Sequence, residues 1–168
     1  MDNSIYLKLF DFAKKNLWDD FKKIILENDK LNLNIRDDNN NYLINFIILN
    51  NKIDILELFL EKKCKIDVID SDNKSILYIP IKFDYHEIVD LLLKYDSSII
   101  GISNTEVKDN NGNYPIHYTI LCKNLKMLKL FKKYNKSFNK FDSENNSLLH
   151  LAIKSNSKEI FDFVLENS

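Results

Sequence analysis

Two histidines and two cysteines are the side chains of this chain best suited to catalysis or metal binding. His117 precedes Cys122 by five residues, and an imidazole beside a thiol can generate a thiolate nucleophile. Cys122 falls late in a predicted helix, however, and no third group that would orient the imidazole is evident. We therefore interpret the pair as non-catalytic and expect that the chain is not an enzyme.

The same side chains do not fit the common metal sites. His117 and His150 occupy equivalent positions in two similar segments, but Asn45 and Tyr78 occupy that position in two others, so a metal ligand is not maintained. The cysteines form no Cys-x-x-Cys motif, which the usual structural zinc sites contain. We predict no metal site and no cofactor, and we interpret both histidines as structural.

Asp109, Asn111 and Asn113 resemble the opening of a calcium-binding loop, which supplies oxygen ligands at alternate positions. Such a loop needs glycine at its sixth position and glutamate at its twelfth, where this chain has Tyr114 and Ile120. The chain also lacks the glycine-rich phosphate-binding motifs and the His-Glu-x-x-His motif. We therefore reject a calcium site in this segment.

The segment that begins at Asp109 is important for another reason, because it recurs. Asp109–Tyr118 has the same plan as Asp142–Leu151, 33 residues later, and Asp37–Phe46 and Asp70–Ile79 form a second pair with the same spacing. Between the two pairs the spacing grows to 39 residues, which indicates an insertion of six. Regular spacing of this kind predicts tandem repeats, in which each unit buries its apolar side against its neighbours.

The repeating unit resembles the ankyrin repeat, which reads Asp-x-x-Gly-x-Thr-Pro-Leu-His-x-Ala and continues into a second helix with Val-x-x-Leu-Leu. The best matches to the first part are Tyr114–His117 and Ser147–Ala152. In that family the histidine hydrogen-bonds backbone between neighbouring repeats. The second-helix pattern recurs at residues 55–60, 88–93 and 160–165, more weakly at 127–132, and a degenerate leading unit contains 10–14 and 21–26.

The resemblance implies an all-α ankyrin-repeat solenoid of helix-turn-helix units with short β-hairpin or turn finger tips. The high content of Asn, Lys and Ile suggests an AT-rich genome, as in some giant viruses, protists or intracellular bacteria. We divide residues 1–168 into one array, with a degenerate N-terminal repeat at 1–36, repeats at 37–69, 70–108 (with the six-residue insertion) and 109–141, and a C-terminal repeat at 142–168.

Local signals refine this array. In the leading unit, helical spacing predicts that Leu7, Phe10, Phe12 and Ala13 bury the first helix. Helices are expected near 42–50 and 54–61. The family usually has glycine in the turn between the paired helices, in a left-handed conformation. Here Asn50-Asn51, Asp84 and Asn156 stand in that place, and Asn is the least costly substitute there.

Two prolines and an insertion are further signals. Pro80 falls inside a first helix, so we expect that helix to be bent or to start later than its equivalents. Pro115 is expected at the first position of its helix, where its missing N–H costs nothing. The longer loop between 97 and 108 carries Gly101 and Asn104, and we expect it to be exposed.

Charge and composition argue against nucleic acid and membranes as partners. The chain carries 24 Lys and Arg against 25 Asp and Glu, a net charge of −1, so it has no general attraction for polyanions. It has no apolar stretch of 18 residues, no signal-peptide pattern, and two unclustered cysteines, Cys64 and Cys122. We expect a cytoplasmic monomer, in the host cytoplasm if the chain is viral or comes from an intracellular pathogen.

The resemblance also implies a function, the non-catalytic binding of another protein on the concave surface and the finger tips. A different possibility is the substrate-recognition part of a ubiquitin-ligase adaptor, or a host-directed effector. Some poxvirus ankyrin proteins carry an F-box-like segment for the first of these roles, and nothing in this chain resembles one.

In the ankyrin family the variable contact positions lie on the finger tips and on the exposed face of the inner helices. Leu49, Phe83 and Leu121 would form an exposed apolar patch, unless a neighbouring tip covers them. Carried over by register, the predicted partner-binding residues are Leu49, Asn50, Asp72, Lys74, Lys82, Phe83, Asn111, Asn113, Leu121, Cys122, Glu144, Asn146 and Lys154.

Overall fold

Paired helices make up most of this chain. The computed structural model describes residues 3–96 and 103–168, and that part contains ten α-helices, one short 3-10 helix and no β-strand. Isolated antiparallel bridges, such as Arg36 with Tyr42 and Phe141 with Ser147, close the bases of the tips. The prediction of an all-α repeat fold is therefore confirmed, with turns rather than β-hairpins at the tips. By its internal contacts the chain divides into two units, residues 1–65 and 66–168.

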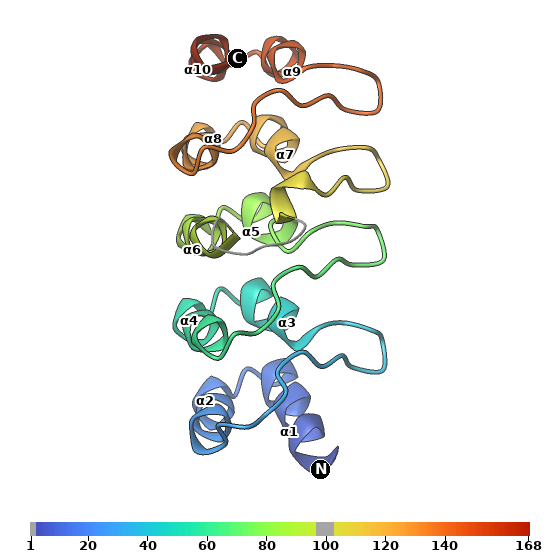
Figure 1. Ribbon diagram of the computed structural model, residues 1–168, viewed down its shortest axis with the longest axis vertical. Helices are drawn as coiled ribbons and strands as arrows, with labels where there is room; N and C mark the ends of the chain where they lie inside the picture. The colour runs from blue at the N-terminus through green and yellow to red at the C-terminus, as the bar shows by residue number, and fades with distance from the viewer. Residues whose placement is uncertain (1–2, 97–102) are drawn as a thin grey trace. The chain divides into compact units, whose positions relative to one another are not determined.

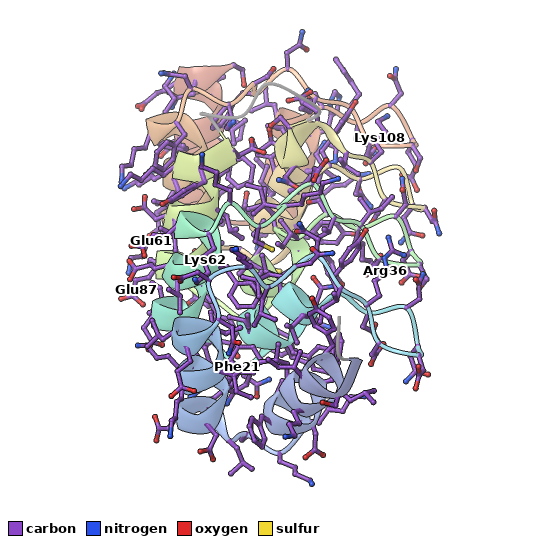
Figure 2. All side chains as sticks on the ribbon, turned by 60° about the horizontal axis from the view of Figure 1, so that its bottom comes forward. Phe21, Arg36, Glu61, Lys62, Glu87 and Lys108 are labelled. Atoms are coloured by element: carbon purple, nitrogen blue, oxygen red, sulfur yellow. The ribbon has the colours of Figure 1, made fainter. Side chains whose placement is uncertain are left out.

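The first unit holds two helix pairs (Figure 1). Phe21 is fully buried and stacks on Phe59, with ring centroids 6.1 Å apart, and Figure 2 shows it pointing inward while Arg36 lies on the side of the tip. Leu9, Phe10 and Ala13 bury the first helix. The prediction for Leu7 was wrong, because this side chain is exposed and Leu9 fills the core in its place. The helices are α1 (Asn3–Lys14), α2 (Trp18–Glu27), α3 (Leu43–Leu49) and α4 (Ile53–Glu61).

The second unit repeats the same plan three times. The first helices of its pairs pack on one another, α5 against α7 and α7 against α9, and the second helices α6 and α8 pack side by side (Figure 1). Each pair is preceded by a tip, the turn that begins at Asp70, Asp109 or Asp142, which projects away from the second helices. The elements are α5 (Tyr78–Lys82), α6 (His86–Asp96), the 3-10 helix η1 (Asn104–Glu106), α7 (Pro115–Leu121), α8 (Leu125–Lys133), α9 (Leu148–Ser155) and α10 (Lys158–Asn167).

The turns between paired helices use a left-handed residue, as the sequence predicts. Asn51, Asp84 and Asn156 have φ values of 52°, 59° and 55°. Asn50 does not share this role, because its φ is −95° and its side-chain amide donates to the Phe46 carbonyl within α3. Lys123 fills the corresponding turn between α7 and α8 with φ at 54°, a conformation that its residue type does not indicate.

The prolines act as expected. The helix that contains Pro80, α5, begins eight residues after Asp70, whereas α7 begins at Pro115, six residues after Asp109. Pro80 has no N–H to donate to the carbonyl four residues earlier, so a regular helix cannot extend through the segment before it. The late start of α5 is therefore confirmed.

The insertion lies partly outside the described residues, which omit 97–102 and with them Gly101. The expectation that Asn104 is exposed was wrong, because Asn104 is buried. Its N–H and side-chain amide donate to Asp96 Oδ1 at 2.7 and 3.1 Å, and Ser103 Oγ donates to Asp96 Oδ2. Lys136 Nζ pairs with the same carboxylate at 2.7 Å. One buried aspartate therefore holds the described end of the inserted loop.

Candidate functional site

The four tips share one internal scaffold, built on the aspartate that begins each repeat. In each tip the Oδ1 atom of this aspartate accepts backbone N–H groups from the residues two and four positions later. For Asp109 the donors are Asn111 and Asn113, both at 2.9 Å, and for Asp142 they are Glu144 at 2.9 Å and Asn146 at 2.8 Å. Asp37 and Asp70 make the same pairs of contacts. The segment that resembles a calcium loop therefore uses its aspartate to hold a turn.

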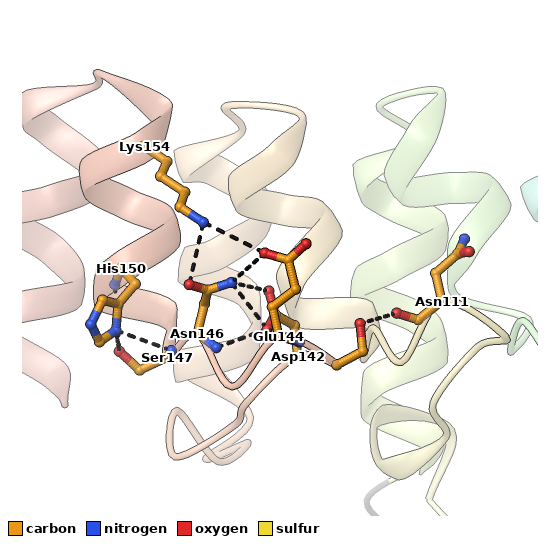
Figure 3. Close-up of polar contacts among 8 residues, drawn as sticks. Asn111, Asp142, Glu144, Asn146, Ser147, His150 and Lys154 are labelled. Carbon is orange, nitrogen blue, oxygen red and sulfur yellow. Dashed lines mark hydrogen bonds and ion pairs between the residues drawn. The ribbon is translucent and has the colours of Figure 1, made fainter.

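Within residues 66–168 the tips also bind one another. The Asn110 N–H donates to the Asp72 carbonyl at 2.9 Å, and Ser143 Oγ donates to the Asn111 carbonyl at 2.8 Å (Figure 3). Gly112 lies at this second contact with φ at +75°, and a Cβ atom there would lie 2.6 Å from Ser143 Cβ. Neighbouring tips are thus held at a spacing that leaves no room for a side chain at Gly112.

A groove of about 770 Å³ runs between the last two tips and the first helices behind them. It brings together six of the predicted partner-binding residues, which come from two tips, α7 and α9. The remaining lining residues lie on or beside the same two tips, apart from Leu151 of α9. The six are Asn111, Asn113, Leu121, Glu144, Asn146 and Lys154, and the others are Lys108, Asp109, Asn110, Gly112, Asp142, Ser143 and Leu151.

The two turn aspartates of this groove are already engaged. Desolvation is the largest influence on the pKa of Asp142 and would raise it, but the hydrogen bonds from Asn146 and Glu144 together hold the pKa below its usual value. The second carboxylate oxygen of Asp109 accepts a hydrogen bond from the Tyr118 hydroxyl. Burial, reinforced by this bond, raises the pKa of Tyr118 to about 12. Both aspartates therefore serve the scaffold of the tips.

Glu144 and Lys154 are two charged side chains of the groove that lie mostly in solvent. Their side chains are 76% and 59% exposed, and Lys154 Nζ lies 3.8 Å from Glu144 Oε2 (Figure 3). Asn146 connects them, because its amide nitrogen donates to Glu144 at 3.2 Å and its oxygen accepts from Lys154 at 3.3 Å. Asn146 is held in place because its amide also donates to Asp142, whereas the long ion pair between Glu144 and Lys154 can rearrange when a partner binds.

A second group of predicted residues lies at the ends of α5 and α7. Phe83 is about half exposed and stacks on Tyr85, with ring centroids 5.9 Å apart, and Lys82 Nζ lies 5.6 Å from the Phe83 centroid. Cys122 is exposed at the end of α7, where partial desolvation raises the pKa of its thiol although the charge of Lys82 opposes this. A raised thiol pKa does not suit a nucleophile.

The remaining predicted residues are placed differently. Asp72 and Lys74 lie on the first tip of the second unit and pair with each other at 2.8 Å, and Lys74 Nζ also lies 4.6 Å from the Tyr78 ring centroid. Lys74 is thus less accessible than the register suggested. Leu49 and Asn50 belong to the first unit, where Leu49 is about half exposed.

The histidines cap helices. His117 is fully buried, and its Nδ1 accepts the Tyr114 N–H at 3.1 Å, which leaves the ring proton on Nε2. Nε2 makes no regular hydrogen bond. Burial lowers the pKa of His117, and the nearby Lys140 backbone opposes this only in part. His150 Nδ1 accepts the Ser147 N–H at 3.2 Å in the equivalent cap (Figure 3). These contacts agree with a structural interpretation of both residues.

Several residues of the groove were not predicted. Lys108 and Leu151 line it, yet the register places neither among the variable contact positions. A second hollow, in the first unit, was also missed: it is lined by Tyr6, Leu7 and Phe10 of α1 and by residues 35–38 of the tip. The apolar Leu7 was its one signal in the sequence, and the helical spacing placed that residue in the core.

The described residues also bear on metal binding and membrane insertion. Across residues 3–96 and 103–168, no cluster of three or more His, Cys, Asp or Glu side chains is arranged to hold a metal ion. Over the same ranges, no helix combines the length and the apolar character needed to cross a membrane.

Comparisons with known proteins give the family context. A family model described as ankyrin repeats (3 copies) matches residues 9–103 and 97–168. An ankyrin repeat protein of Acanthamoeba polyphaga mimivirus is 38% identical over 148 residues, which is 87% of this chain and 19% of that protein. One from Fowlpox virus (strain NVSL) is 28% identical over 118 residues, 68% of this chain and 15% of that protein. The chain thus spans less than a fifth of either relative.

Proposed function

Since this chain belongs to the ankyrin-repeat family, whose members are in general non-enzymatic protein-interaction modules, we propose that it binds another protein through the groove of residues 66–168. The observation that carries this proposal is the convergence of tip residues and Leu121 on one groove. Predicted contact residues from both tips, α7 and α9 line it together.

The composition of the groove suits protein recognition. Leu121 is 54% exposed and offers an apolar contact, while Asn111, Asn113 and Asn146 carry amides that can both donate and accept hydrogen bonds. The scaffold beneath them is held by the turn aspartates and by contacts between tips, so the surface loses little conformational freedom when a partner binds. Phe83 extends the apolar surface beyond the groove, and aromatic side chains often dominate binding energy.

A binding experiment with matched variants tests the proposal. Partners are isolated with the chain as bait, and the affinity of each purified partner is measured by calorimetry. Leu121→Asp is expected to reduce affinity at least about tenfold, since it places a charge in the contact. Leu165→Asp is the control, because Leu165 is 55% exposed but lies on α10 outside the groove. Equal affinities of the two variants for every partner would refute the proposal.

Phe83→Ala tests whether the binding surface extends from the groove to the neighbouring aromatic side chains. If the partner extends from the groove over α5, this variant weakens binding while its circular dichroism spectrum and urea midpoint stay near those of the parent chain. A folded variant with unchanged affinity would confine the binding surface to the groove.

The relatives from mimivirus and fowlpox virus suggest where this binding takes place. We propose a monomeric, non-enzymatic adaptor or host-directed effector that works in the cytoplasm of an infected cell. Light scattering of the purified chain and fractionation of infected cells test the oligomeric state and the compartment. Recruitment of a ubiquitin ligase would require a segment beyond the repeats described above.

A further inference from the structure

The groove between the last two tips carries five ionisable side chains, and most of them are committed to the fold. Asp109 and Asp142 each accept two backbone N–H groups of their own tip. The Lys108 ammonium lies 5.0 Å from the Tyr114 ring centroid, so an aromatic face engages it. Lys108 is exposed and lies on that ring, so Glu144, with Lys154 beside it, is the carboxylate of the groove that a partner's cation can reach.

The ion pair between Glu144 and Lys154 is easily replaced. Their ammonium and carboxylate lie 3.8 Å apart, and both side chains are mostly in solvent. Surface pairs of this kind contribute little to stability, because water screens them and both side chains lose freedom. Lys154 therefore acts as a weak internal occupant of the Glu144 carboxylate, and a better placed cation from a partner can displace it.

The charge balance favours a basic partner. The groove holds three carboxylates and two ammonium groups, so its net charge is negative even with Lys154 in place. Displacing the Lys154 side chain into solvent makes the local field more negative. An arginine suits the vacated carboxylate best, since its planar guanidinium can make two parallel hydrogen bonds to one carboxylate.

The other feature within reach is apolar. Leu121 lines the same groove and leaves 54% of its surface uncovered, while Leu151 supplies a buried apolar floor. A partner that brings only a cation would leave this surface in water. A partner that places an aliphatic or aromatic side chain beside its cation would cover it and gain from its burial.

We propose that the groove between the last two tips recognises a protein segment with Arg or Lys next to a bulky apolar residue, with the cation taking the place of Lys154 at Glu144. This inference rests on the proposed function and adds the chemistry of the partner. It predicts a result that net charge alone does not give: Lys154→Ala should tighten binding, because it removes the internal competitor, whereas Lys158→Ala removes the same charge outside the groove and should not.

Selection of binders from a displayed random peptide library, with the whole chain as the immobilised target, tests the inference. Panning on the parent chain, with a Leu121→Asp variant as the counter-selection, is expected to enrich peptides that place Arg or Lys beside Leu, Ile, Val or Phe. One enriched peptide is then measured by fluorescence polarisation. Glu144→Lys should weaken it at least about tenfold, and Lys154→Ala should tighten it about two- to fivefold, the range expected when an exposed ion pair is removed.

Charge-matched controls lie on α10. Glu159→Lys and Lys158→Ala change the net charge by the same amounts at exposed positions outside the groove, so they should leave the affinity unchanged. Enriched peptides that are acidic or uncharged, or a peptide whose affinity ignores Glu144→Lys, would overturn the inference. If such a peptide still loses binding with Leu121→Asp, the proposed function stands. If no peptide is enriched over the counter-selection, both fail.

Discussion

Gly112 offers the sharpest test of how the tips are held together. A Cβ atom at this position would lie 2.6 Å from Ser143 Cβ and 3.1 Å from Ser143 Cα, closer than non-bonded carbons approach. Ser143 cannot simply retreat, because its Oγ donates to the Asn111 carbonyl and Asp142 holds the turn around it. Gly112→Ala should therefore strain both tips.

Three contributions set the size of the effect. Alanine in the left-handed region costs about 1–2 kcal/mol, and inserting a methyl group into a packed contact costs about 1–3 kcal/mol. The unfolded chain loses some freedom when glycine is replaced, which offsets about 0.4–1 kcal/mol. The free energy of unfolding should fall by about 3 kcal/mol.

Urea unfolding followed by circular dichroism measures this change, and Asn145→Ala is the matched control. Asn145 occupies the same place in the next tip with φ at 62°, and it already carries a side chain, so its replacement should cost only about 1 kcal/mol. The double variant Gly112→Ala with Ser143→Gly should recover part of the loss, since the shortest contact disappears. Equal destabilisation by Gly112→Ala and Asn145→Ala would show that the collision with Ser143 does not occur.

Four further predictions concern residues outside the groove or beneath it. Lys136→Met leaves the buried carboxylate of Asp96 without its cation and should cost about 3 kcal/mol in urea unfolding. Burial would raise the pKa of Asp96, but Lys136, Ser103 and the Asn104 N–H together hold it lower, so its contribution to stability is present at neutral pH and lost as the pH falls below about 4; Asp96→Asn should flatten the acid limb of a pH–stability curve. Lys123→Gly relieves a left-handed lysine at φ 54° and should raise the free energy of unfolding by about 1 kcal/mol. The pKa of Tyr118 is raised to about 12, so its stabilising bond to a carboxylate is lost as the pH rises from about 10 towards 12, and an ultraviolet titration should show a late ionisation that Tyr118→Phe removes.

The sequence predicts this fold well at positions where the residue type favours the backbone conformation that the repeat requires or forbids. The family register places Asn51, Asp84 and Asn156 in the turns between paired helices, and Asn and Asp tolerate the positive φ found there better than other non-glycine residues. Pro80 likewise indicates a disturbed helix. Lys123 adopts the same turn conformation with no such tendency, and its register alone could have indicated the turn.

Prediction failed where the exposure of a side chain depends on which neighbours pack against it. Asn104 has the character of a polar loop residue, but Asp96 and Lys136 form a buried polar cluster around it, and Lys136 comes from a different repeat. Lys74 has the character of an exposed contact residue, but Tyr78 and Asp72 hold it. In both cases local composition describes the side chain correctly and says nothing about what will pack against it.

In each tip, the backbone forms a turn that one aspartate holds, and the neighbouring side chains are left to form the candidate site. The aspartate at the start of the tip binds the N–H groups two and four residues later, so the backbone of those residues is held whatever side chain they carry. Their side chains line the groove as Asn111 and Asn113 in one tip and as Glu144 and Asn146 in the next. Substitutions at such positions can change recognition without changing the turn, whereas the aspartate itself has no such freedom. A surface arranged in this way can alter its choice of partner while its fold stays the same, which is why the chemistry of Glu144 and Lys154 informs the choice of partner more than the fold does.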